Sequence, residues 1–328
     1  MNIRILSICV LHLKKMLYIY LFFGIFINSQ GLNSAENLKH ISQEDKVILK
    51  DFFQSLFAEG DFAHTLFGSK PMAFIDYRIE LKFLQSDEYP RKKAVIAMRG
   101  WDTWKKYQHL FQMENFYLVS TKAFNNSFSI ALVSKKNVLN LIKDNLSLFQ
   151  ESLGLEDTVS IIFDKILHQW VFSSVFDKKK IPKHYSKCIG ILLGYGKANS
   201  EAFEERDTYK CLLATAPLNP RLFENEKLMK TVRGMGNYPH LPNQTYTIQA
   251  HSLIAKLNLL EQNYGYIQAT FKNNFLCPVR SPRFMSIKNN PETNIIKKNY
   301  DQFCEELVKI YYSEKFLEII LDRLGSVD

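Results

Sequence analysis

The chain has 328 residues, of which 46% are hydrophobic and 23% are charged, and its formal net charge is +9. Such a composition can bury a large core and excludes an intrinsically disordered chain. The basic residues are spread along the sequence instead of forming one patch with interleaved aromatics, so we expect no nucleic-acid partner. Even the densest run, Lys178 to Lys180 with Lys183 and Lys187, is interpreted as solvated surface.

The first 31 residues have the order of a secretory signal. Two lysines precede an apolar run from Met16 to Ile27, and small and polar residues follow it. This run is shorter than the roughly 20 residues that a membrane-spanning helix needs. We therefore expect residues 1–31 to be a signal peptide or an uncleaved N-terminal anchor, with translation starting at Met1 or Met16. The expected location is the periplasm, the cell envelope or the medium, with membrane contact only through an uncleaved segment.

Export bears on the cysteines. Four follow residue 31, and none of them forms a CxxC pair, so no zinc or thioredoxin-type site is predicted. An oxidising compartment would allow two disulfides, but a chain of this length can also bury free thiols. The sequence leaves the disulfide state open for Cys188, Cys211, Cys277 and Cys304.

A helix followed by a strand opens the folded part. Ser42 can cap a helix over 42–59, apolar residues recur in it at helical spacing, and Gly60 can end it. From Ile75 to Phe83 apolar and polar residues alternate, which predicts a strand with one buried face.

The next elements end the first half of the chain. We predict a short strand over 94–98, a helix over 101–113, a hairpin over 116–134 and helices over 135–154 and 156–176. In the helix 101–113 the residues expected to face inward are Trp104, Tyr107 or His109, and Phe111. Asn125 and Asn126 suit the hairpin turn because asparagine tolerates positive φ, and Ser134 can cap the helix after it.

The polar, basic and proline-containing stretch 177–187 is the predicted boundary between regions 36–176 and 187–328. Beyond it we predict strands over 188–196 and 211–216, a short helix over 200–210 capped by Ser200, a loop over 217–242, a helix over 251–263, a strand over 264–271, and an amphipathic helix over 300–324, continuous or broken near Ser313. Helices and strands intermix without a regular βαβ order. The predicted class is therefore α+β with a mainly antiparallel sheet, in one body or in two packed subdomains.

The segment 62–77, "FAHTLFGSKPMAFIDY", joins the first helix to the first strand and has two interpretations. In the first, the segment is a structural connection whose apolar residues Phe62, Leu66 and Phe67 pack under the end of the helix. In the second, it is a site, because functional residues favour loops on rigid scaffolds.

The candidate site residues in this segment are His64, Lys70 and Asp76, with Ser69 nearby. They match no catalytic order, and a base needs a nucleophile within hydrogen-bond reach. We favour the structural connection. We accordingly expect Phe67 to matter more for stability than His64 or Lys70, which tolerate alanine if they are exposed.

A glycine-rich stretch from Gly190 invites comparison with phosphate-binding loops. A Walker A loop needs four residues between its glycines and a serine or threonine after its lysine, but five residues separate Gly190 from Gly196 and Ala198 follows Lys197. A dinucleotide fingerprint needs a third glycine at the position where Asn199 stands. Both fingerprints therefore fail, and the stretch is predicted to be a plain strand-to-helix turn. The chain after residue 31 also has no HExxH, GxSxG or SxxK, so no cofactor, no metal and no catalytic residue is assigned.

Two stretches, "HTLFGSKPMAFIDY" (64–77) and "IGILLGYGKANSEAFEERD" (189–207), together resemble a family of uncharacterised exported or membrane-anchored proteins of chlamydia-like intracellular bacteria. The resemblance implies a bacterial, cell-envelope or host-facing setting. It brings no activity, cofactor or catalytic residue.

Two functions are compatible with these features. The first is an exported or envelope-associated interaction protein, non-enzymatic, whose partner is an unidentified protein or envelope component. The second is an exported hydrolase with a site assembled from separated residues, including the 62–77 segment. A deep pocket lined by His64, Lys70 or Asp76 with displaced pKa values would favour the hydrolase, and a flat apolar patch would favour the interaction protein.

Overall fold

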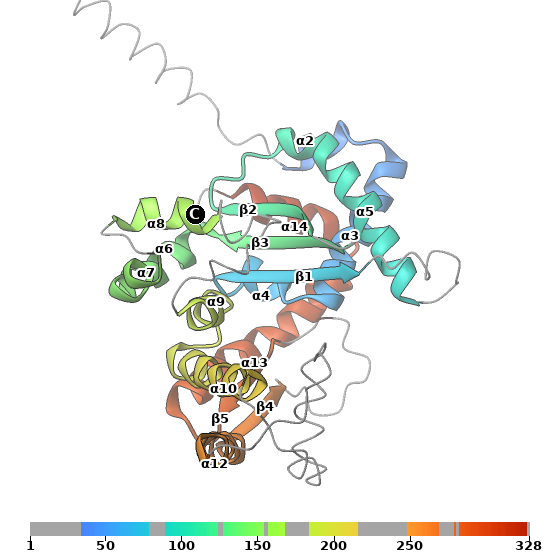
Figure 1. The fold of residues 1–328 in the computed structure, drawn as a ribbon. Helices are drawn as coiled ribbons and strands as arrows, with labels where there is room; N and C mark the ends of the chain where they lie inside the picture. The colour runs from blue at the N-terminus through green and yellow to red at the C-terminus, as the bar shows by residue number, and fades with distance from the viewer. Residues whose placement is uncertain are drawn as a thin grey trace, which may run out of the picture.

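The computed structural model describes residues 34–78, 89–123, 127–153, 157–167, 184–215, 248–268, 279 and 282–326. In this part of the chain, helices surround a three-stranded antiparallel sheet, and a second, two-stranded sheet lies near the helices α10 (Lys197–Thr215) and α12 (Ile248–Asn263) (Figure 1). The fold class is α+β, as the sequence predicts. The N-terminal segment 1–31 lies outside the described residues, so its role in export stays a prediction.

After the short helix α2 (Ser34–Lys39), the helix α3 (Gln43–Glu59) begins where Ser42 predicts it. The hydroxyl oxygen of Ser42 accepts a hydrogen bond from the backbone N–H of Asp45 at 3.2 Å, and Gly60 ends the helix. The buried face of α3 consists of Leu49, Phe52, Phe53, Leu56 and Phe57.

The strand predicted over 94–98 is wrong, because these residues belong to the helix α5 (Tyr89–Tyr107). Ala94 and Ala97 are buried three residues apart, whereas Val95 and Met98 are exposed, which is helical spacing. The inward positions of Trp104, Tyr107 and Phe111 are confirmed, the last after the short 3₁₀ helix Gln108–Leu110.

The main sheet has the strand order β1-β3-β2, and both pairs are antiparallel. Its strands are β1 (Met72–Arg78), β2 (Phe116–Ala123) and β3 (Ser127–Ser134). The hairpin is confirmed, and its turn at 124–126 lies outside the described residues. On β1, Tyr77 is buried and Ile75 is half-buried against the same core, as the alternation predicts.

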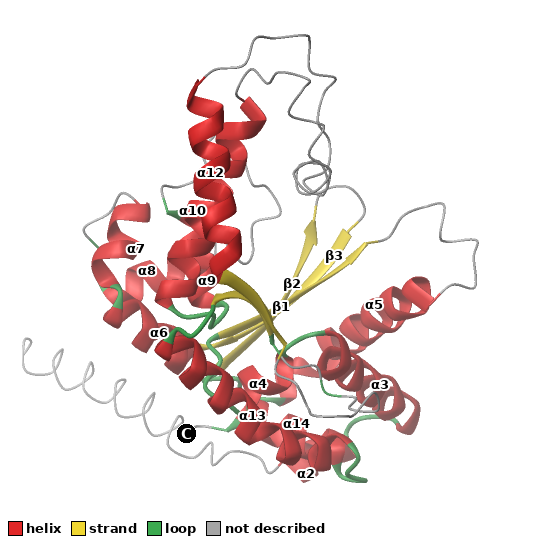
Figure 2. Cartoon of the chain, turned by 90° about the horizontal axis from the view of Figure 1, so that it is seen from below, coloured by secondary structure: helices red, strands yellow, loops and turns green. Residues whose placement is uncertain are grey.

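The helices α6 (Lys135–Asp144), α7 (Leu146–Leu153) and α8 (Val159–Lys165) follow, and the cap at Ser134 is confirmed by its bond from the backbone N–H of Asn137. Figure 2 shows these helices on one side of the three strands, with α3 and α5 on the other. Buried residues accordingly form two clusters. One lies around α3, α5 and the C-terminal helix α14 (Phe316–Gly325), and the other lies around α6, α7, α8 and the following helix α9 (Tyr185–Leu192).

The strands predicted over 188–196 and 211–216 are also wrong. The chain instead forms α9 (Tyr185–Leu192), a turn from Leu193 to Gly196, and one long helix, α10 (Lys197–Thr215). Cys188, Ile191 and Leu192 are buried at helical spacing, and a short apolar run does not by itself distinguish a strand from a buried helix. Ser200 lies inside α10 and donates to the carbonyl oxygen of Gly196, so it does not cap the helix.

The described cysteine side chains are buried. Cys188 is a free thiol, and its burial raises its pKa to about 11. Cys304 is buried as well, while the side chains of Cys211 and Cys277 lie outside the described residues.

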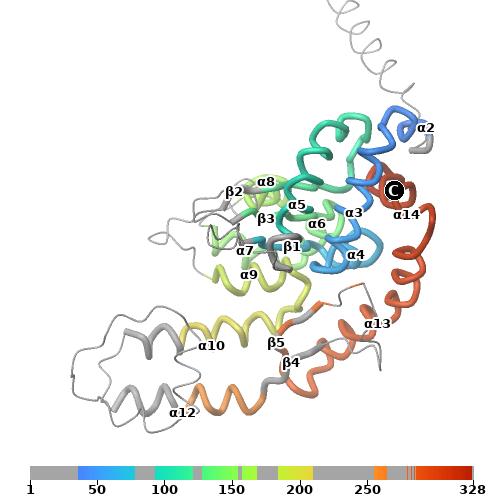
Figure 3. Tube along the Cα trace, turned by 90° about the vertical axis from the view of Figure 1, so that its right-hand side faces the viewer, coloured from blue at the N-terminus to red at the C-terminus, as the bar shows by residue number. Residues whose placement is uncertain are grey.

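The predicted helix and strand after residue 250 are present as α12 (Ile248–Asn263) and β4 (Tyr264–Gln268), which pairs with β5 (Arg283–Ile287). The C-terminal helix is broken near Ser313 into α13 (Pro291–Tyr311) and α14 (Phe316–Gly325). Figure 3 shows α13 rising from β5 to α14, which packs beside α3 and contributes Phe316 and Ile320 to its core. The division into 36–176 and 187–328 stays a prediction. No described helix is both long enough and apolar enough to cross a membrane.

Candidate functional site

The segment 62–77 is a short helix, α4 (Phe62–Leu66), followed by a turn and β1. Phe62 and Leu66 are buried, and the Phe67 ring packs edge-on against Phe57 with 6.3 Å between ring centroids. The apolar side chains therefore anchor the connection, as the sequence predicts. The condition under which His64 and Lys70 would tolerate alanine, exposure of their side chains, is not met, because each residue is only 1% exposed.

Lys70 is held in the interior by three groups. Its ammonium donates a hydrogen bond to the carbonyl oxygen of Leu193, lies 3.6 Å from Asp61 Oδ2, and sits 5.1 Å from the centre of the Tyr195 ring. Burial lowers the pKa of this lysine, and the carboxylate of Asp61 opposes that change. A buried charge without such partners would be strongly unfavourable, so the three contacts explain why a lysine can occupy this position.

His64 lies beside Lys70 in the same interior region. Its ring contacts the Tyr300 ring edge-on at 5.2 Å, and neither ring nitrogen has a hydrogen-bond partner among the described residues. Burial, with a smaller contribution from the charge on Lys70, lowers the pKa of His64 to about 3. The imidazole is therefore neutral near pH 7.

The turn Leu193–Gly196 brings the two sequence stretches together, although Lys70 and Leu193 are 123 residues apart. Gly194 and Gly196 both have positive φ, at 75° and 84°. The Tyr300 hydroxyl donates to the carbonyl oxygen of Gly194 at 3.0 Å, and a Cβ on Gly194 would lie 2.6 Å from that hydroxyl. Burial raises the pKa of Tyr300. The two glycines thus adopt positive φ and leave space for side chains of neighbouring elements, such as Tyr300 and Glu292.

The N-terminus of α10, which the sequence made a candidate phosphate site, is occupied by a carboxylate of the chain itself. Glu292 accepts hydrogen bonds from the backbone N–H groups of Lys197 at 2.8 Å and Ala198 at 2.9 Å. The positive end of a helix attracts anions, and Glu292 supplies that negative charge from α13.

The structural role of Asn199 explains why this position is not the third glycine of a dinucleotide-binding fingerprint. Its carbonyl oxygen accepts bonds from the backbone N–H of Ile287 and the hydroxyl of Thr293, both at 3.0 Å, and its amide donates to Tyr195. A buried asparagine that ties α10 to β5 and α13 is a structural residue. The stretch is a plain turn as predicted, although it connects two helices and not a strand to a helix.

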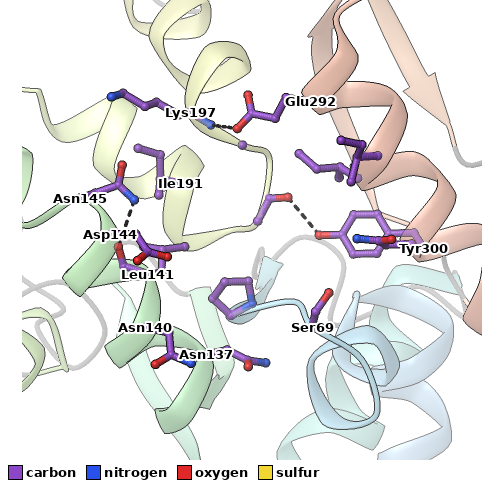
Figure 4. Close-up of a pocket in the computed structure, with 16 residues that line it drawn as sticks. Ser69, Asn137, Asn140, Leu141, Asp144, Asn145, Ile191, Lys197, Glu292 and Tyr300 are labelled. Carbon is purple, nitrogen blue, oxygen red and sulfur yellow. Dashed lines mark hydrogen bonds between the residues drawn. The ribbon is translucent and has the colours of Figure 1, made fainter.

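A cleft of about 610 Å³ lies beside this turn, between the 69–71 loop, α6 and α13 (Figure 4). Its aliphatic lining includes Leu141, Ile191 and Ile295, and Figure 4 shows Asn140 and Glu292 on opposite sides of the hollow. Neither His64 nor Lys70 lines it.

Several polar residues of the cleft have no side-chain partner among the residues that the structure describes. Asn137 and Asn145 donate to backbone carbonyls, and Glu292 is taken up by α10. The remaining polar residues make no side-chain hydrogen bond or ion pair within the described part of the chain: Ser69, Asn140, Asp144, Lys197 and Asn299. These side chains are available to a ligand.

The structure does not assemble the predicted candidate residues into one site. His64 and Lys70 come together in the interior, Ser69 lines the cleft, and Asp76 lies elsewhere on β1, exposed and accepting a hydrogen bond from Ser129 at 2.8 Å. Among the described residues, no group of three or more His, Cys, Asp or Glu side chains could hold a metal ion. Sequence reasoning missed Asn140 and Ile295. Ile295 had a signal in the helical spacing, because it lies off the row of α13 positions that is buried at Tyr300, Cys304 and Leu307.

Comparison of the chain with protein-family models, with curated proteins and with solved structures found no match.

Proposed function

We propose that this chain is a non-enzymatic interaction protein, exported or held at the cell envelope, which binds its partner through the cleft between α6 and α13. The observation that carries the proposal is a contrast around the turn 193–196. The cleft presents polar side chains that have no side-chain partner within the described part of the chain, whereas His64 and Lys70 are buried and do not line it.

The size and lining of the cleft support binding. Its volume of about 610 Å³ falls within the range of about 300–1,000 Å³ that is typical of ligand sites. Ile295 on its wall is 62% exposed and leaves apolar surface that a partner can cover.

The hydrolase alternative gains no comparable support. A general base must reach a nucleophile or a water molecule at the reacting centre. The His64 ring nitrogens have no hydrogen-bond partner among the described residues, and the ammonium of Lys70 is held by Leu193 and Asp61.

The setting is part of the same proposal. Residues 1–31 have the order of an export signal, and the resemblance of 64–77 and 189–207 to envelope proteins of chlamydia-like bacteria agrees with it. A fusion of residues 1–40 to a reporter that is active only outside the cytoplasm should give activity. The same fusion with Leu21→Arg, which places a charge in the apolar run, should lose it. A reporter that stays inactive with the native sequence contradicts export.

The cleft is tested by site-specific photo-crosslinking in cells that express the full chain. A photoreactive residue at Ile295 should give a discrete adduct of higher mass. Leu259 on α12 is the matched control, because it is also 62% exposed and does not line the cleft. Absence of an adduct at Ile295, or the same adduct at both positions, contradicts binding through the cleft.

A further inference from the structure

The chemistry of the cleft walls restricts the class of ligand. The walls disfavour a phosphate-containing ligand. The best anion site nearby, the N-terminus of α10, is already filled by the carboxylate of Glu292, which accepts from two backbone N–H groups. Among the described residues that line the walls, Lys197 is the only basic one, which is little for a polyanionic ligand.

The walls also disfavour a ligand that binds by stacking on an aromatic ring. Nucleobases bind by stacking on exposed aromatic faces, and the aromatic side chain that lines the cleft is Tyr300. Tyr300 is buried, its hydroxyl is bonded to Gly194, and its ring packs against His64. It therefore offers no platform to a base or to the flat face of a sugar.

What remains on the walls matches a polypeptide backbone. A carboxamide carries one carbonyl acceptor and an NH₂ donor, which is the complement of a peptide unit. Asn140 on α6 and Asn299 on α13 supply such groups from two elements of the cleft, and neither has an intramolecular side-chain partner within the described part of the chain. The aliphatic surface of Ile295 lies exposed on the same wall as Asn299.

We propose that the cleft binds an extended peptide segment of the partner, with an aliphatic side chain packed on Ile295 and its backbone paired with Asn140 and Asn299. Asp144 and Lys197, one acid and one base, would favour a segment that carries both charges and would fix its direction. This inference rests on the proposed function, because it names the chemistry recognised by the same cleft.

The probe is a random octapeptide library displayed on phage and selected on the full chain. Enriched peptides are synthesised with a fluorescent label, and binding is measured by anisotropy. We expect enriched sequences to share an aliphatic residue. Ile295→Asp and Asn140→Ala should each weaken binding about tenfold or more, whereas Leu259→Asp should leave it unchanged. Thermal melts of the three variants show whether each of them is folded.

Several outcomes overturn the inference. The first is a selection that enriches no peptide, and the second is peptide binding that Leu259→Asp weakens as much as Ile295→Asp does. The third is saturable binding of inorganic phosphate or of a chitooligosaccharide that Ile295→Asp abolishes. A crosslinked adduct at Ile295 without peptide binding overturns the peptide chemistry and leaves the interaction function standing. If neither a crosslinked adduct at Ile295 nor peptide binding is observed, both the interaction function and the peptide chemistry are rejected.

Discussion

The interior around Lys70 and the neighbouring cleft contrast in their use of polar side chains. In the interior, residue types associated with catalysis are engaged in structure: Lys70 is bonded to Leu193, and His64 packs against Tyr300. In the cleft, residues of types that are rarely catalytic, such as Asn140 and Asn299, have no side-chain partner in the described part of the chain. The candidate site is therefore marked by polar side chains that are free to contact a ligand, and not by residue types associated with catalysis.

The strongest test of this contrast removes the buried charge. Lys70→Ala leaves the carbonyl oxygen of Leu193 without its donor and the carboxylate of Asp61 without its partner. We expect the free energy of unfolding to fall by about 3–5 kcal/mol, the range for breaking a buried ion pair. Denaturant unfolding measures this, with Lys298→Ala on an exposed position as control. Equal small losses for both variants would place Lys70 outside the structural core.

A second test addresses the turn that joins the two regions. Gly194→Ala imposes a side chain at φ 75° and brings its Cβ within 2.6 Å of the Tyr300 hydroxyl. We expect a loss of about 2–3 kcal/mol from backbone strain and the close contact. At Gly325 a Cβ would meet nothing within 4 Å, so Gly325→Ala should be neutral or slightly stabilising in thermal melts. A tolerated alanine at 194 would refute the tight turn.

The third test uses pH. The folded pKa of His64, about 3, lies below its ordinary value of 6.5, so the unfolded chain takes up the proton first as pH falls. The stability that the neutral histidine contributes is complete above pH 6.5 and is lost progressively as pH falls towards 3. Between pH 7 and pH 5, wild type should lose about 2 kcal/mol more than His64→Phe, which cannot titrate. Parallel pH profiles of unfolding would contradict a buried neutral His64.

The smallest effect is expected in the cleft. Asn140→Ala should change the free energy of unfolding by less than about 0.5 kcal/mol, because its exposed side chain has no partner within the described part of the chain. The same variant should lower binding of a cleft ligand. A large loss of stability would show that Asn140 is structural, which would remove the contrast between cleft and interior.

Local sequence signals predicted many elements correctly. The cap at Ser42, the amphipathic pattern of α3 and the hairpin over 116–134 all depend on residues within a few positions of one another. Of the two alternatives at the C-terminus, the structure has the helix broken near Ser313. The failures at 94–98 and 188–196 share a cause. Both are short apolar runs, which fit a buried strand and a buried helix equally, and packing against neighbours decides between them.

The sequence by itself determined the α+β class, the hydrophobic anchoring of 62–77 and the absence of known nucleotide-binding fingerprints at 190–199. Only the tertiary structure decided that His64 and Lys70 are interior and that Glu292 caps α10 from 95 residues away. The physical reason is distance along the chain. Burial of a polar group depends on partners that other segments supply, and no local pattern records which segments will meet.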